Sequence, residues 1–150
     1  METPVRQVTR RLHEEHVATL ALCSRLEATL AAGKTDPVLM RAAAATLAGE
    51  IERHFAFEES DLFPRLRAAG EGELADLLHE EHVTIRAATQ QFIALVKSNP
   101  LDPGLKPVGL ELAERLASHA QKEEMSLLPA LDQLLDEGAD HELACAYAAL

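Results

Sequence analysis

The segments HFAFEESDLFPRL at residues 54–66 and HAQKEEMSLLPAL at residues 119–131 share one pattern, H-x-x-x-E-E-x-x-L-[FL]-P-x-L. A shorter motif, HEEH, also occurs twice, at residues 13–16 and 79–82. The two pairs of copies are separated by nearly the same number of residues. The two halves of the chain therefore look like copies of one structural unit.

The composition and the helix boundary signals predict four long helices. Leu and Ala predominate, aromatic residues make up 3% of the chain and Trp is absent, which favours helix. Thr3-Pro4, Asp36-Pro37 and Asp102-Pro103 are typical of helix starts. Helix ends are indicated at Gly33, Gly70, Asn99-Pro100 and Gly138. We expect helices over residues 4–32, 37–69, 73–98 and 105–136, with a short fifth helix over 140–149.

Short connections between long helices predict antiparallel neighbours. The expected fold is an all-α, up-down-up-down four-helix bundle built from a duplicated helical hairpin. The hairpins would span residues 4–69 and 73–136, with a tail at 137–150, and residues 1–150 would form one domain. Two similar hairpins pack most simply about a pseudo-twofold axis, which would bring the repeated polar residues together in the bundle core.

The overall charge and the cysteine content exclude several functional classes. A net charge of −11 argues against binding to nucleic acid or to an anionic membrane surface. No run of apolar residues is long enough to span a membrane, and the first residues lack the apolar region of a signal peptide. Two cysteines, Cys23 and Cys145, do not make a disulfide framework. We therefore expect a cytoplasmic location.

Helical periodicity predicts which polar residues point into the core. At about 100° per residue, two histidines, two His/Glu pairs and the apolar residues of their helices share faces. The six polar residues on these faces are His16, His54, Glu58, His82, His119 and Glu123. His13 and His79 lie about 60° away, at the rims of these faces. Glu59 and Glu124 are expected to point away from them.

Buried imidazoles and carboxylates need a partner, and a metal ion is a suitable one. Neutral His with carboxylate suits iron, manganese or zinc. A His and a Glu four residues apart on a helix can reach the same metal centre. Two such pairs plus one His from each other helix match a dinuclear site, with each Glu bridging and each metal receiving two His.

Other interpretations fit the sequence less well. A single His in a helical stripe is usually a core residue, and one H-x-x-x-E pair is often a surface ion pair, but the matched repetition favours a metal site. HEEH lacks the H-E-x-x-H spacing of zinc proteases. Ferritin-like di-iron bundles place Glu before His at a spacing of three, whereas this chain places His first at a spacing of four.

The combination of His16, HFAFEESDLFP from His54, His82 and HAQKEEMSLLP from His119 resembles the hemerythrin-like HHE cation-binding family. The resemblance extends from about residue 8 to residue 136. It implies a non-haem centre of two iron ions with an oxo or hydroxo bridge, for which manganese or zinc could substitute. The ligands implied by the resemblance are His16, His54, Glu58, His82, His119 and Glu123.

The chain departs from the oxygen-carrying members of that family. They supply a fifth His from an H-x-x-x-H pair in the third helix and use Asp as one bridge, whereas here the third helix has H-x-x-H and both bridges are Glu. Each iron has roughly six coordination positions. Two His, the two bridging Glu and a bridging oxygen would fill five of them, which leaves one position open on each metal. Two open positions favour peroxide or nitric oxide turnover, or iron release.

Three functional classes therefore remain open. The chain could be a di-iron protein that binds O2, peroxide or NO, or a di-iron oxidoreductase that reacts with one of them. It could store or donate iron for repair, or it could carry or sense O2, which would require His13 or His79 to swing in as a fifth ligand. Otherwise we expect His13 and His79 to contact ligands rather than metal, to relay protons or to lie at the surface. The sequence identifies no redox partner, and nothing in it places Tyr147 near the metals.

Overall fold

All regular elements among the described residues, 3–34 and 36–150, of this computed structural model are helical. This confirms the predicted all-α class. In chain order the elements are α1 (Gln7–Ala31), α2 (Pro37–Thr46), η1 (Leu47–Ile51), α3 (Glu52–Phe57), η2 (Glu58–Leu62), α4 (Phe63–Ala68), α5 (Gly72–Ser98), α6 (Leu105–Met125), α7 (Leu127–Leu134) and α8 (Glu137–Ala148).

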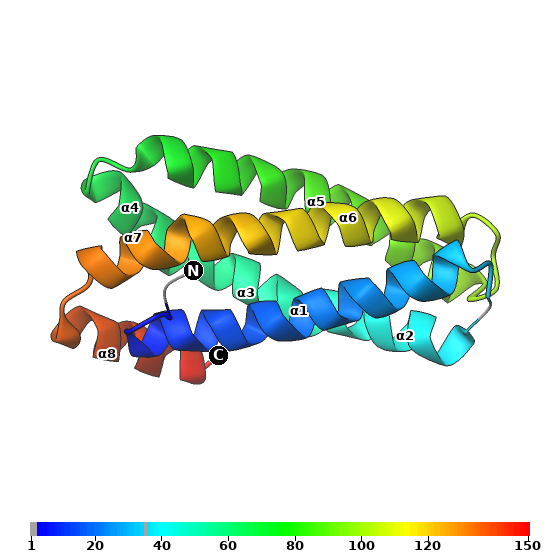
Figure 1. Cartoon of the computed structure of the whole chain (residues 1–150), viewed down its shortest axis with the longest axis horizontal. Coiled ribbons are helices and arrows are strands. Elements are labelled where there is room, and N and C mark those ends of the chain that lie inside the picture. Colours follow the sequence, from blue (N-terminus) through cyan, green and yellow to red (C-terminus); the bar gives the residue numbers. More distant parts are fainter. Residues whose placement is uncertain (1–2, 35) are drawn as a thin grey trace.

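The long helices lie lengthwise beside one another and form a bundle (Figure 1). In Figure 1, α1 runs from left to right, the segment from α2 to α4 returns, α5 runs to the right again and α6 with α7 returns. α6 packs against both α1 and α5, and α5 also contacts α2 and α4. α8 packs beside the first half of α1. Every long helix therefore contributes one side to a shared interior.

Three of the predicted boundary signals act as expected. Asp36 caps α2, because its Oδ1 accepts a hydrogen bond of 2.9 Å from the backbone N–H of Leu39, and Pro37 takes the first helical position. Gly33 and Gly70 follow the ends of α1 and α4 with φ angles of 68° and 85°. These left-handed conformations favour glycine. The first two connections are thus determined locally.

The predicted cap at Thr3 is wrong, because α1 begins at Gln7. Its first amides find a carboxylate that is distant in sequence. Asp140 of α8 accepts hydrogen bonds of 2.9 and 3.0 Å from the backbone N–H groups of Gln7 and Val8. Gly138 was also predicted to end a helix, but it lies inside α8, whose start is capped by Asp136. The helix predicted over 105–136 ends at Leu134 instead.

The predicted helices 37–69 and 105–136 are interrupted before Pro64 and Pro129, as their prolines suggest. A proline ring clashes with the carbonyl group four residues earlier. The first helix continues through the wide π-helical turn η2, just before Pro64. The second breaks at Ser126, which has φ −129° and ψ −62° and separates α6 from α7.

The buried apolar side chains form two clusters. One includes Cys23, Met40, Phe92 and Leu112, and the other includes Leu12, Phe57, Leu78 and Leu127. A third set of buried side chains, all of them polar, lies along the helices between residues of the two clusters. Across residues 3–34 and 36–150, none of the helices combines the length and the apolar character needed to cross a membrane.

Candidate metal centre

The predicted polar residues meet in one buried layer of the bundle. Five helical elements contribute to it, and every member is at most 6% exposed. The members are His16 from α1, His54 from α3, Glu58 from η2, His82 from α5, and His119 and Glu123 from α6. The structure therefore brings together all six residues that the sequence suggested as ligands.

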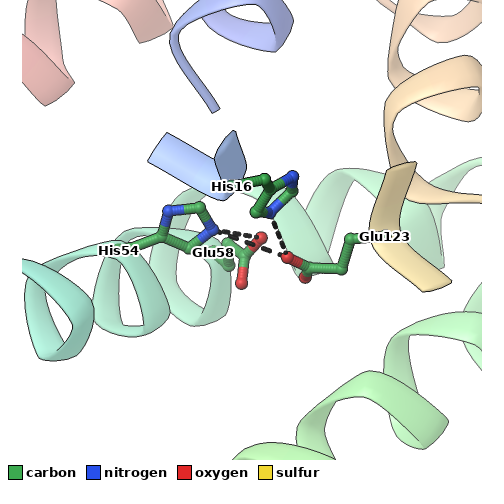
Figure 2. A group of neighbouring side chains, drawn as sticks. All are labelled: His16, His54, Glu58 and Glu123. Carbon is green, nitrogen blue, oxygen red and sulfur yellow. Dashed lines mark hydrogen bonds and ion pairs between the residues drawn. The ribbon is translucent and has the colours of Figure 1, made fainter. Parts of the chain in front are cut away.

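The six residues form two groups that share both glutamates. His16 and His54 belong to the first group and His82 and His119 to the second, and Glu58 and Glu123 belong to both. Within each group the potential ligand atoms lie within 4.8 Å of one another. Figure 2 shows the first group, with the two imidazoles and the two carboxylates pointing toward one another. The two groups therefore fit metal binding, with both carboxylates shared between them.

All four histidines direct Nε2 toward the inner carboxylates. Nε2 of His16 lies 2.8 Å from Oε1 of Glu123, and Nε2 of His54 lies 3.2 Å from Oε2 of Glu58. Nε2 of His82 lies 3.1 Å from Oε1 of Glu58.

In the second group the Nε2 atoms of His82 and His119 also lie 3.1 Å apart. Two nitrogen lone pairs at this distance repel unless a proton or a metal ion lies between them. A proton or a metal ion is therefore needed between these two nitrogens.

Two buried oxygen atoms reinforce this conclusion. Oε1 of Glu58 and Oε2 of Glu123 have no hydrogen-bond partner, although both carboxylates are fully buried. The close approach of His82 to Glu58 Oε1 is a charge contact that lacks hydrogen-bond geometry. Leaving a buried carboxylate oxygen unpaired is costly. Coordination of a metal by these oxygens would remove that cost, so the residues present fit a dinuclear metal site.

Each histidine is also held from behind by a second carboxylate. The Nδ1–H of His16 donates to Glu124 at 2.7 Å, and that of His54 donates to Glu15 at 2.9 Å. An ionised carboxylate can only accept, so Nδ1 carries a proton, and Nε2 is the nitrogen that a metal would bind by displacing the proton it shares with the inner carboxylates.

The other two histidines repeat this arrangement. The Nδ1–H of His82 donates to Glu59 and that of His119 donates to Glu81, both at 2.7 Å. Each supporting glutamate is on a different segment from its histidine. Glutamates on α1, η2, α5 and α6 contact histidines on α3, α5, α6 and α1, respectively. The repeated HEEH is thereby explained in part, since its second Glu supports a histidine on the next helix and its second His faces inward.

The prediction that Glu59 and Glu124 point away from the site is wrong. Helical periodicity tests only whether a side chain points toward the bundle core. Glu59 and Glu124 lie on the flanks of their helices, where they reach a neighbouring helix. Glu124 is only 8% exposed. The sequence reasoning also missed Glu15 and Glu81. Their repetition at equivalent places in the two HEEH copies was the signal that could have identified them.

His13 and His79 lie outside the inner layer. His13 contacts the carboxylate of Glu124 through Nδ1, and its side chain is 39% exposed. The side chain of His79 is 51% exposed, and its Nε2 lies 3.9 Å from the Glu59 carboxylate. Both histidines are therefore placed to contact the supporting glutamates rather than the inner carboxylates.

The charges of the layer shift the protonation equilibria. Burial disfavours the charged form of His119, but the carboxylates of Glu123 and Glu58 outweigh it and raise its pKa to about 9. The pKa of His54 is raised well above its usual value against the effect of burial, chiefly by the charge of Glu58. Burial would raise the pKa of Glu123, yet His119, His16 and His54 lower it well below its usual value. The inner glutamate therefore stays ionised and attracts cations.

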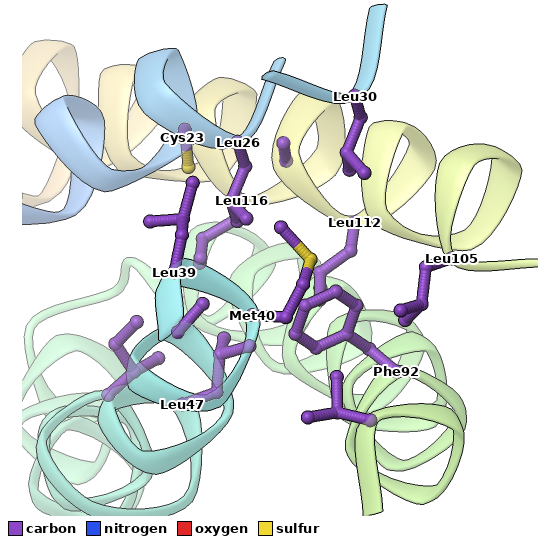
Figure 3. Packing of buried hydrophobic residues seen from close by; sticks show 14 of the residues in the cluster. Cys23, Leu26, Leu30, Leu39, Met40, Leu47, Phe92, Leu105, Leu112 and Leu116 are labelled. Carbon is purple, nitrogen blue, oxygen red and sulfur yellow. The ribbon is translucent and has the colours of Figure 1, made fainter. Parts of the chain in front are cut away.

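Apolar side chains close the layer on both sides. Phe55 stacks on the His82 ring with the ring centres 3.9 Å apart, and Phe63 lies 5.5 Å from the same ring. Phe55 belongs to the first apolar cluster, other members of which are shown packed between the helices in Figure 3. Low polarity around the layer strengthens the electrostatic interactions within it.

The fold and the site define a helical protein whose buried His/Glu clusters fit a metal centre. Residues 7–131 match the family model of the Hemerythrin HHE cation binding domain. The chain belongs to this family, as the sequence resemblance predicted. Comparisons with curated proteins and with solved structures gave no match.

Proposed function

We propose that this chain is a non-haem di-iron protein that reacts with a small oxidant, O2, peroxide or NO, inside a single up-down-up-down four-helix domain. The observation that carries the proposal is the pair of His/Glu groups sharing Glu58 and Glu123. Two bound irons, joined by an oxo or hydroxo bridge, would supply one-electron redox chemistry and open coordination positions. Two unpaired cysteines, Cys23 and Cys145, are consistent with a cytoplasmic location.

The protein's own groups would hold and orient the metals. His16 and His54 would bind one iron, His82 and His119 the other, and the two inner glutamates would bridge them. The supporting glutamates hold the Nδ1 protons, which keeps every Nε2 lone pair directed inward. The phenylalanines beside the layer would keep bulk water away.

The positions of the rim histidines favour reaction over reversible oxygen carriage. His13 is engaged by Glu124, and His79 is half exposed beside Glu59. Neither supplies a fifth nitrogen to the inner layer. With two His per metal, each iron would keep an open position, which suits chemistry that involves both metals.

A surface hollow borders the site and would be the approach for small molecules. It lies between α5 and α6, has a volume of about 500 Å3 and is lined in part by His119 and Glu81. Glu80, Glu111 and Glu114 also line it. Negative charge at the mouth disfavours anions. This supports neutral oxidants as reactants and ferrous iron as the entering metal.

The test is anaerobic loading with ferrous iron followed by exposure to O2. We expect two irons per chain and a visible absorption change that persists after degassing, followed by peroxide or nitric oxide turnover. A band that disappears on degassing and returns with O2 would instead indicate carriage or sensing. Rapid loss of iron to a mild chelator, without turnover, would indicate iron storage or donation.

Two matched variants separate the ligand role from a general effect. His82→Ala removes a fully buried imidazole, and His79→Ala removes a half-exposed one three residues earlier on the same helix. We expect His82→Ala to lose iron and His79→Ala to retain most of it. Equal iron loss from both variants would contradict the assigned ligand set.

A further inference from the structure

Tyr147 is the only tyrosine of the chain and lies in the last turns of α8. It is 2% exposed, and its ring stacks on Phe57 with the ring centres 4.3 Å apart. Its hydroxyl donates a hydrogen bond to Oε1 of Glu15. Burial and the contact with Glu15 raise the pKa of Tyr147 to about 12, so the hydroxyl keeps its proton at neutral pH.

The same oxygen of Glu15 accepts the Nδ1–H of His54. Tyr147 and His54 therefore both donate to Oε1 of Glu15. Arg11 lies 3.2 Å from the other oxygen of that carboxylate. A hydrogen bond from the tyrosine fixes the orientation of Glu15. It also weakens the pull of Glu15 on the His54 proton, which makes the imidazole a weaker electron donor.

Hydrogen bonds attach α8 to the start of α1. The carboxylate of Asp140 caps the start of α1, so α8 is attached to the helix that carries Glu15 and His16. The family match ends at residue 131, before α8 begins. The contact therefore joins Tyr147, which lies outside the matched residues, to Glu15, which lies within them.

The equivalent place on the other half of the site is different. Glu81 supports His119 as Glu15 supports His54, but its further partner is the cation Lys122. The hollow beside His119 and Glu81 has a volume of about 500 Å3, whereas that beside His54 and Glu15 has about 80 Å3. Through Tyr147, α8 thus contacts only one of two otherwise similar histidine–carboxylate pairs.

We propose that Tyr147 is a positioning residue for the metal centre, acting on His54 through Glu15 and making the two metal positions unequal. The inference rests on the metal-binding function proposed above. Its chemical content is limited to one hydrogen bond, from the tyrosine hydroxyl to the Glu15 carboxylate. The position that takes His54 as ligand is the one affected.

Titration of the metal-free protein with Co2+ tests this, because the absorption of Co2+ reports its ligand geometry. The wild-type protein should bind two ions. Tyr147→Phe keeps the ring stack and removes the hydroxyl, and we expect it to weaken one of the two binding steps by about threefold to tenfold, less than the loss of a direct hydrogen-bond partner of a ligand. The absorption of that ion should change, while the other step stays within twofold.

Two further variants exclude a merely structural role. Leu143→Ala loosens the packing of α8, since Leu143 is a buried member of the second apolar cluster. It should lower thermal stability and leave both Co2+ affinities within twofold. In a Glu15→Ala background, Tyr147→Phe should have no additional effect, because the proposed path is already broken.

Two results would overturn the inference: unchanged Co2+ binding and absorption in Tyr147→Phe, or the same metal effect in Leu143→Ala. An additive effect of Tyr147→Phe in the Glu15→Ala background would overturn the path through Glu15. Failure of the wild-type protein to bind any Co2+ would count against the metal-binding function itself. The two failures are therefore distinguishable.

Discussion

The metal-free protein should become less stable as the pH rises from 6.5 to about 9. One group that contributes to the effect is His119, which is 2% exposed and whose pKa the neighbouring carboxylates raise from 6.5 to about 9. In this pH range the folded protein holds a proton on His119 that the unfolded chain has released. The free energy of unfolding therefore falls by about 1.4 kcal/mol per pH unit.

Over this range the loss amounts to about 3 kcal/mol from His119 alone, a large part of the stability of a typical domain. The stabilisation is fully present below pH 6.5 and is lost as the pH approaches 9, the direction expected of a histidine with a raised pKa. His16 and His54 also have raised pKa values and act in the same direction. The lowered pKa of Glu123 affects stability only under acidic conditions, where protonation removes its contribution.

The assay is urea unfolding of chelator-treated protein at several pH values, with the free energy of unfolding obtained by linear extrapolation. His119→Gln removes the titrating ring and should flatten the pH dependence. His141→Gln changes an exposed histidine on α8 and should leave the dependence unchanged. A free energy of unfolding that is constant or rises between pH 6.5 and 9 in the wild-type protein would refute the reasoning.

Three other predictions concern metal and stability. His16→Ala should abolish binding of one metal, whereas His13→Ala, which removes only a contact to Glu124, should weaken metal binding by less than about tenfold. Iron analysis after gel filtration compares the two variants, and equal iron losses would contradict the ligand assignment. Ferrous iron at about 100 times its dissociation constant should stabilise the fold by about 2.7 kcal/mol for each iron bound, and a chelator should reverse this in thermal unfolding. An unchanged melting temperature argues against binding to the folded state. Asp140→Ala leaves two amides of α1 unpaired and should lower the free energy of unfolding in urea by about 1–3 kcal/mol. An unchanged free energy of unfolding would indicate that water replaces the cap.

The helical class could be predicted because its signals are local. Asp36-Pro37, Gly33 and Gly70 act within a few residues of their own positions, and the structure uses them as expected. The start of α1 could not be predicted, because Asp140 caps it from the other end of the chain. A contact between residues so distant in sequence follows only from the packed structure.

Periodicity identified the inward residues but not their supporting partners. The direction of a side chain relative to one helix axis separates core from surface, and His54 and Glu58 were found in this way. It gives no information about a residue on the flank of its helix, such as Glu124, whose partner is on another helix. Tyr147 was left without a role for the same reason, since its contact with Glu15 depends on where α8 docks.

The supporting contacts explain why the chain needs both of its similar halves. The pairs His54–Glu15 and His119–Glu81 each lie within one half, whereas His16–Glu124 and His82–Glu59 each join the two halves. One hairpin alone would therefore hold only one of its two histidines in the metal-binding tautomer. Each metal group also takes one inner glutamate from each half. The contacts that complete the site are thus also contacts between the two halves, so metal affinity and the association of the hairpins should rise and fall together.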